Sequence, residues 1–198
     1  MKRFLYFSLL LLLAVGSTIP TVQAQFFRYY PDLTRPRSIQ TADEGFVMMA
    51  SRNANVQLVR LDQVGDVIWD RYLWKSIGSG GDFGGKFVIE TQDGGYVASW
   101  TNDNSRYFWR MDQWGDTLWS TNLDTISGLL NLMGAVETQD GGFISVGSVS
   151  TDSAETYFES CLIRIDSLGS SSGMQMYDLD SVPEVARGSI VHTADNGF

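Results

Sequence analysis

Cysteine, histidine and proline are scarce in this chain of 198 residues, which has one Cys, one His and four Pro. The single cysteine, Cys161, excludes an internal disulfide framework, so the fold must depend on a hydrophobic core. With His192 as the only histidine and no Gly-x-Ser-x-Gly elbow, the sequence argues against a nucleophilic triad. Apolar neighbours of Cys161 predict a buried, unreactive thiol.

Basic residues are also few, with 14 Lys and Arg against 23 Asp and Glu and a net charge of −9. Binding to nucleic acid or to anionic lipid needs clustered positive charge, so neither partner is expected. Hydrophobic residues make up 43% of the chain, which is enough to build a core. A net charge of this size also helps to keep a protein in solution.

The N-terminus has the three parts of a secretory signal peptide. Lys2 and Arg3 are followed by an apolar run over 4–15 and by small residues at 22 and 24. The run is shorter than the roughly 20 residues of a membrane-spanning helix. We therefore expect a signal peptide at 1–24, cleavage after Ala24, no membrane span in the mature chain, and a secreted or bacterial cell-surface protein.

The remaining chain repeats two motifs. The first begins at Thr41, Thr91, Thr138 and Thr193, where the sequence reads TADEGF, TQDGGY, TQDGGF and TADNGF. The second reads RLDQVGDVIW, RMDQWGDTLW and, in degraded form, RIDSLGSSSG. The copies lie about 50 residues apart, close to the length of one propeller blade.

Within each copy, apolar and polar residues alternate with the period of a β-strand. In the second copy this predicts strands at 86–90, 96–100, 106–111 and 117–122, joined by Gly- and Asp-rich turns. Four antiparallel strands in each repeat are typical of a propeller blade. The predicted fold is therefore all-β, an incomplete β-propeller of about three blades plus the start of a fourth.

The expected domain spans 25–198, with repeats at approximately 37–85, 86–133, 134–187 and a truncated 188–198. Residues 26–30 resemble the fourth strand of the first repeat, so we expect them to complete the last blade as a displaced strand. Propellers have four or more blades. The sequence is therefore expected to be a fragment, with further blades or a sorting domain elsewhere in the same protein.

The pattern T-x-D-G-G-[FY] followed by [RK]-[LMI]-D-x-x-G-D-x-x-W resembles a repeat of large secreted bacterial proteins. The resemblance implies a β-propeller and, in many such proteins, a C-terminal sorting domain for type IX secretion. The second motif is also similar to the docking motif of quinoprotein-dehydrogenase propellers. That similarity implies that Trp69 and Trp119 pack between neighbouring blades, while Gly173 replaces Trp in the third copy.

A row of polar residues immediately before each first motif gives the candidate ligand-binding site: Gln40, Glu90, Glu137 and His192. If the first strand of each repeat is innermost, these side chains face a central channel and could hold a cation or a polar ligand. The alternative places them at strand ends in bulk water.

Two acidic turns give a candidate calcium site, with Asp62 and Asp66 in the first repeat and Asp112 and Asp116 in the second. Calcium takes six to eight oxygen ligands, and two carboxylates supply at most four. The alternative is that Asp and Gly simply form hairpin turns. Separately, Arg60, Arg110 and Arg164 recur on the third strand, where we expect each to pair with an acid across the sheet.

These observations favour a non-catalytic secreted or cell-surface repeat protein that binds or adheres to an extracellular glycan or protein. Two alternatives remain open. The chain could belong to a propeller enzyme, either a quinoprotein-like oxidoreductase or a glycan-degrading enzyme, whose catalytic residues lie outside it, or it could be a structural spacer. No cofactor other than calcium is expected.

Overall fold

The computed structural model describes residues 29–53, 55–74, 84–101, 105–124, 130–150, 158–177, 190–191, 193 and 197. The predicted signal peptide and His192 lie outside these ranges. Over the described residues, no helix is long and apolar enough to cross a membrane.

The described residues form three antiparallel four-stranded sheets, one for each repeat. The first sheet has the order β1 (Thr34–Gln40), β2 (Phe46–Arg52), β3 (Asn55–Leu61), β4 (Val67–Trp74). The second has the order β5 (Gly84–Glu90), β6 (Tyr96–Thr101), β7 (Arg106–Met111), β8 (Thr117–Asn122). The third has the order β9 (Leu130–Glu137), β10 (Phe143–Ser150), β11 (Phe158–Ile165), β12 (Ser171–Tyr177). The all-β prediction is confirmed.

The strands of the second repeat follow the predicted alternation closely, and β7 and β8 have the predicted bounds. Two bounds differ: β6 extends to Thr101, one residue beyond the prediction, and β5 begins at Gly84 instead of residue 86. A Cβ on Gly85 would lie 2.7 Å from Cε of Met49 in the first sheet. Glycine is a poor strand former, but here it allows two sheets to approach closely.

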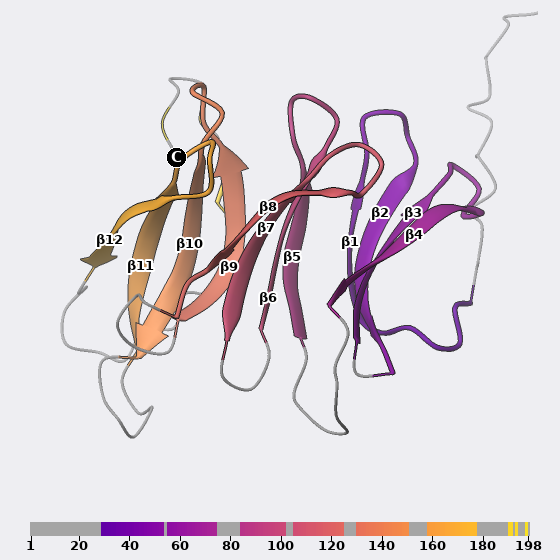
Figure 1. Cartoon of the computed structure of the whole chain (residues 1–198), viewed down its shortest axis with the longest axis horizontal. Coiled ribbons are helices and arrows are strands. Elements are labelled where there is room, and N and C mark those ends of the chain that lie inside the picture. Colours follow the sequence, from indigo (N-terminus) through magenta and orange to yellow (C-terminus); the bar gives the residue numbers. More distant parts are fainter. Residues whose placement is uncertain are drawn as a thin grey trace, which may run out of the picture.

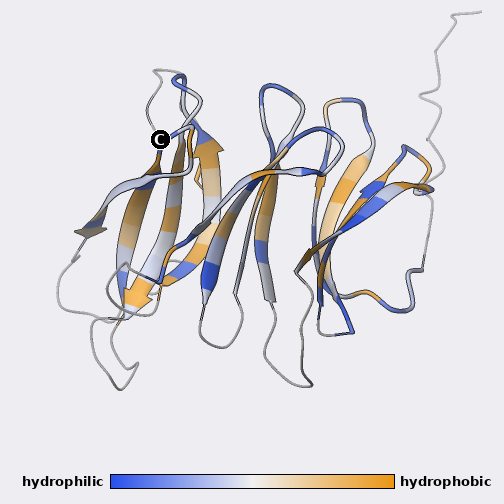
Figure 2. Cartoon of the chain, viewed as in Figure 1, coloured by the Kyte–Doolittle hydropathy of each residue, from blue (hydrophilic) through white to orange (hydrophobic). Residues whose placement is uncertain are grey.

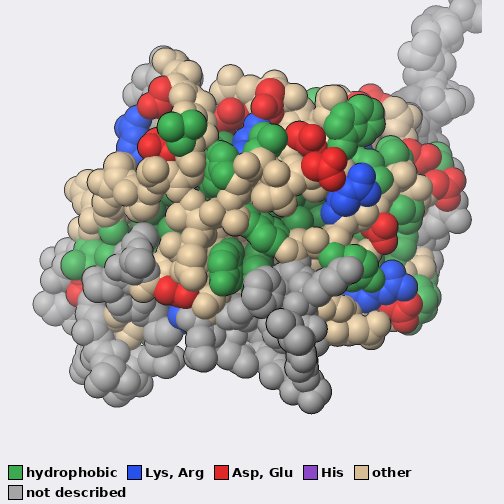
Figure 3. Space-filling view, in the orientation of Figure 1, with side chains coloured by type: hydrophobic (Ala, Val, Ile, Leu, Met, Phe, Trp, Pro, Cys, Tyr) green, Lys and Arg blue, Asp and Glu red, His purple; other side chains and the backbone are tan. Residues whose placement is uncertain are grey.

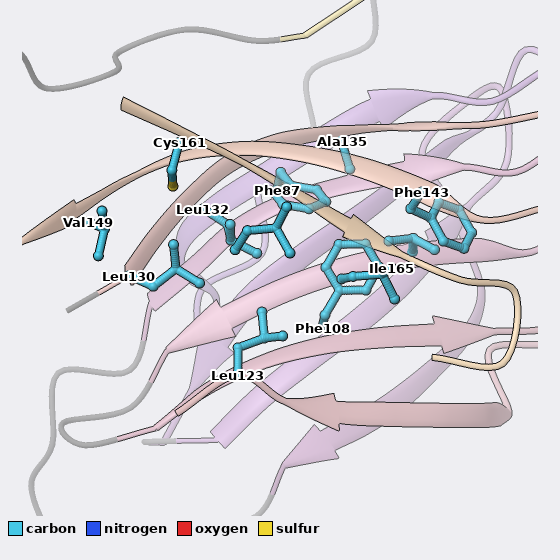
Figure 4. Packing of buried hydrophobic residues seen from close by; sticks show 12 residues of the cluster. Phe87, Phe108, Leu123, Leu130, Leu132, Ala135, Phe143, Val149, Cys161 and Ile165 are labelled. Atoms are coloured by element: carbon cyan, nitrogen blue, oxygen red, sulfur yellow. The ribbon is translucent and has the colours of Figure 1, made fainter. Parts of the chain in front are cut away.

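The three sheets stack along the long axis of the molecule, with β1 beside β5 and β5 beside β9 (Figure 1). Hydrophobic residues are concentrated along the strands (Figure 2). One buried cluster joins the first and second sheets and includes Met49, Leu58 and Trp100. Another joins the second and third sheets and includes Phe108 and Phe143 (Figure 4). The ring centroids of these two residues lie 5.7 Å apart. The sheets are thus held together by their faces.

The outer face of the first sheet is covered by residues 30–33. Tyr30 and Leu33 pack against a cluster of Met48, Ala50, Val59 and Leu61. Residues 29 and 30 are not part of a strand here, and 26–28 lie outside the described residues, so the displaced strand expected at 26–30 stays a prediction.

The outer face of the third sheet keeps partly exposed apolar side chains. Ile144, Val146 and Leu162 occupy the register positions that Val47, Met49 and Leu58 occupy in the first sheet. Those three counterparts are fully buried by the second sheet. The third sheet therefore presents to solvent a face that is a contact surface in the first.

Candidate functional site

The first motif folds as a turn that is locked to the third strand of its own sheet. In the second repeat, Thr91 N donates to Gly95 O at 2.9 Å, and Thr91 Oγ1 donates to Asp93 Oδ1 at 2.7 Å. Arg110 donates from Nη2 to Asp93 Oδ2 at 2.5 Å and also bonds Met111 O. The recurring Thr, Asp, Gly and Arg are therefore explained as one structural unit.

The same unit recurs in the other sheets, with Arg60 and Asp43 2.5 Å apart and Arg164 and Asp140 2.7 Å apart. The predicted pairing of each arginine with an acid is confirmed, although the acid lies in the turn and not on the facing strand. The Arg60 side chain is 7% exposed and that of Arg164 is 55% exposed. Arg60 is covered by the second sheet, where Tyr96 bonds to it, whereas no further sheet lies over Arg164 in the part of the chain that the structure describes.

These contacts lower the pKa of the three turn carboxyls. The main cause of the lowered pKa is a threonine hydroxyl, that of Thr41 for Asp43 and that of Thr138 for Asp140. The paired arginine lowers each pKa further. For Asp93, burial raises the pKa, but the Thr91 hydroxyl, the Gly95 amide and Arg110 together outweigh that effect. The hydrogen bonds and arginine pairs of the turn thus favour the charged form of each carboxyl.

The predicted ligand-binding row lies at the ends of β1, β5 and β9, which are neighbours in the stack. Glu90 Oε2 accepts a hydrogen bond from Ala42 N at 2.7 Å, and Glu137 Oε2 accepts one from Gln92 N at 2.7 Å. Gln40 Nε2 donates to Glu44 O at 3.3 Å. Each glutamate therefore ties its strand to the first turn of the preceding repeat. Whether the row faces a channel stays a prediction, and His192 lies outside the described residues.

The predicted calcium turns are closed by their own first aspartate. Asp62 Oδ1 accepts from Val64 N at 2.9 Å and from Asp66 N at 2.8 Å, and Asp112 Oδ1 makes the same two bonds in the second repeat. Asp116 forms a 3.3 Å ion pair with Arg71 of the first sheet. Over the described ranges no three His, Cys, Asp or Glu residues gather as a metal site. A calcium ion here stays a prediction, and the hairpin alternative accounts for the observed bonds.

Trp69 and Trp119 lie between neighbouring sheets, as the docking motif implied. Each ring packs against the glycine of the next repeat's acidic turn, so that a Cβ on Gly115 would lie 2.7 Å from Trp69 and one on Gly169 would lie 2.8 Å from Trp119. Trp119 Nε1 also donates to Ser167 O at 3.0 Å. The second motif therefore joins successive sheets at their outer strands.

A cavity of about 160 Å³ lies between residues 29–33 and the first sheet. Its lining residues are Tyr29, Tyr30, Pro31, Asp32, Leu33, Arg52, Gln57, Val59, Val67 and Asp70. Gln57 is 1% exposed, and its Nε2 donates to Asp70 Oδ2 at 2.5 Å. Gln57 Oε1 is buried and accepts no hydrogen bond from the residues described.

The sequence prediction missed this cavity, although the repeat contained a signal for it. The second repeat has Tyr107 and Trp109 at the register positions of Gln57 and Val59. The smaller pair in the first repeat leaves space that the aromatic pair occupies in the second.

Cys161 lies on β11 within the cluster between the second and third sheets and is 1% exposed. Burial raises the pKa of its thiol to about 11. The prediction of a buried thiol is confirmed, and such a thiol is a poor nucleophile at neutral pH.

No protein-family model matches the sequence, and no curated protein matches it significantly.

Proposed function

We propose that this chain is a non-catalytic protein of the cell surface or the extracellular space that binds an extracellular glycan or protein. The observation that carries the proposal is a row of exposed apolar side chains at one position of the acidic turn. Val64 is 53% exposed, Trp114 58% and Leu168 81%. A turn accepts polar residues at such a position, so an apolar side chain in all three repeats favours a contact surface.

This row lies on what we call the turn edge, formed by residues 41–45, 62–66, 91–95, 112–116, 138–142 and 166–170 (upper edge in Figure 1). Asp and Glu side chains gather along the same edge (Figure 3). The recurring Thr, Asp and Arg side chains bond to one another within each turn, which favours a structural role for them over a catalytic one. Contacts repeated along one edge would add avidity for a repetitive ligand.

We further propose that the three sheets are consecutive blades of a β-propeller. The adjacency of β1, β5 and β9 and the tryptophan docking between outer strands support this arrangement. The hydrogen bond that closes the first motif also occurs a fourth time, with Thr193 N donating to Gly197 O at 2.9 Å. A further sheet of the same type would cover Ile144, Val146 and Leu162.

The proposal is tested by probing glycan and extracellular-protein arrays with the full chain and three variants. Trp114→Ala and Leu168→Ser should each weaken binding by about fivefold or more, because exposed anchors at an interface carry much of its affinity. Met176→Ser, which changes an exposed apolar side chain on β12, should leave binding unchanged. Binding that responds equally to all three variants, or no binding on either array, would contradict the proposal.

A further inference from the structure

The turn edge carries the whole formal net charge of the chain. Nine of the 23 Asp and Glu residues lie in its six segments, and none of the 14 Lys and Arg residues does, so 14 acids balance 14 basic residues elsewhere. Arginines of the strands pair with four of the nine acids, namely Asp43, Asp93, Asp116 and Asp140. These four pairs offset fewer than half of the acids, so the turn edge stays negative.

Each exposed apolar side chain of the turn edge lies beside a carboxylate of its own turn. The backbone N of Val64, Trp114 and Leu168 donates at 2.9 Å to Oδ1 of the aspartate two residues earlier. All three residues are more than half exposed. Hydrophobic and acidic side chains are therefore interspersed along one edge of the molecule (Figure 3).

Neighbouring sheets hold the acidic turns of the second and third repeats in place. Arg71 of β4 pairs with Asp116 at 3.3 Å, which ties the second repeat's turn to the first sheet. Trp119 of β8 donates from Nε1 to Ser167 O at 3.0 Å, which ties the third repeat's turn to the second sheet. A row whose spacing is set before binding loses little conformational entropy when a partner binds.

We propose, on the basis of the binding function proposed above, that the turn edge binds a Lys- and Arg-rich segment of another extracellular protein. The charge of the edge attracts such a segment and repels an acidic glycan. The aliphatic stems of Lys and Arg can cover Val64 and Leu168 while their charged ends reach the carboxylates. The ring of Trp114 can receive a guanidinium or ammonium group over its face. A neutral glycan would use the apolar side chains and leave the carboxylates without a cation.

The test measures the binding of three labelled peptides to the full chain by fluorescence anisotropy. The peptides are three copies each of Lys-Gly-Leu-Ser, Gln-Gly-Leu-Ser and Glu-Gly-Leu-Ser, so they have the same apolar content and differ in charge. The Lys peptide should bind at least about tenfold more tightly than the Glu peptide. Raising NaCl from about 50 to about 500 mM should weaken its binding by about fivefold or more, because salt screens exposed charges.

Two pairs of charge-removing substitutions separate the turn edge from the charge of the whole chain. Asp112→Asn/Asp166→Asn should weaken binding of the Lys peptide by about fivefold or more, while each Asn keeps the Oδ1 acceptor that closes its turn. Asp32→Asn/Glu159→Gln is the matched control. Asp32 pairs with the last residue of β2 and Glu159 lies near the start of β11, at the strand ends opposite the turn edge. This control should bind within about twofold of the parent chain.

Trp114→Ala changes an exposed side chain, so it keeps the test decisive if the double variant misfolds. It should weaken binding of the Lys peptide by about fivefold. The proposal would be overturned by equal binding of the three peptides, by unchanged binding in Trp114→Ala, or by a control that loses as much as the double variant. Glycan-array binding that is lost in Trp114→Ala, with no binding of the Lys peptide, would retain the proposed function and reject a basic partner. No binding on either array and none of any peptide would reject both.

Discussion

At the scale of single residues, Glu44 stands where the repeat favours glycine. Its φ is 67°, in the left-handed region, and the matching residues in the second and third repeats are Gly94 and Gly141, with φ of 79° and 74°. A non-glycine residue in this conformation costs roughly 1–2 kcal/mol. Part of that cost is offset, because glycine would lose more backbone entropy on folding. The first repeat thus has local backbone strain that the second and third repeats avoid.

Glu44→Gly should therefore stabilise the chain by about 0.5–1 kcal/mol and raise the melting temperature by about 2 °C or more. Glu44→Gln is the matched control, because it removes the charge from the acidic edge and keeps the strain. The reverse change, Gly94→Glu, should destabilise by about 1 kcal/mol, and an added Cβ there meets no atom within 4 Å. Equal melting temperatures for Glu44→Gly and Glu44→Gln would show that backbone strain is absent.

At the scale of elements, each turn of the first motif is tied to the third strand by an arginine–aspartate pair. The pKa of Asp93 is lowered from 3.8 in the fold, where burial opposes and Thr91, Gly95 and Arg110 outweigh it. A carboxyl whose folded pKa is depressed contributes stability above its unfolded pKa and loses that contribution as the pH falls through its folded pKa. Asp43 and Asp140 act in the same direction.

We therefore expect stability to be nearly constant between about pH 7 and 5 and to fall below about pH 4. Asp93→Asn should lose about 1–2 kcal/mol at pH 7, because Arg110 is left buried without its charged partner, and should flatten the acid dependence. Denaturant titration at several pH values measures both. Asp32→Asn, which breaks an exposed ion pair, should cost less than about 0.5 kcal/mol. The same loss in both variants would contradict a special role for the turn pair.

The elements were largely readable from the sequence, because alternation and Gly-rich turns are local signals. The partners of Glu90 and Glu137 were not readable, since each carboxylate binds a backbone amide 45–48 residues earlier, across the contact between sheets. The cavity was missed for another reason. It depends on space left by Gln57 and Val59, and only comparison with Tyr107 and Trp109 in the folded register makes that space visible.

At the scale of the whole molecule, the repeats permit one position to be compared in three environments. Leu58, Phe108 and Leu162 occupy matched places on β3, β7 and β11. The first two are fully buried by the next sheet, while Leu162 is partly exposed on the outer face of the third. The free energy lost on truncation should therefore report whether a further sheet covers that face.

In the full chain, Leu58→Ala should cost about 2–5 kcal/mol and Phe108→Ala about 3–5 kcal/mol, because each leaves a cavity between two sheets. Leu162→Ala should cost about 1 kcal/mol or less, because its side chain still meets solvent. Equilibrium unfolding of the three variants measures these differences, and the first two serve as controls for the third. A cost for Leu162→Ala that equals that of Leu58→Ala would mean that the outer face of the third sheet is covered in solution, by a second copy or by another part of the protein.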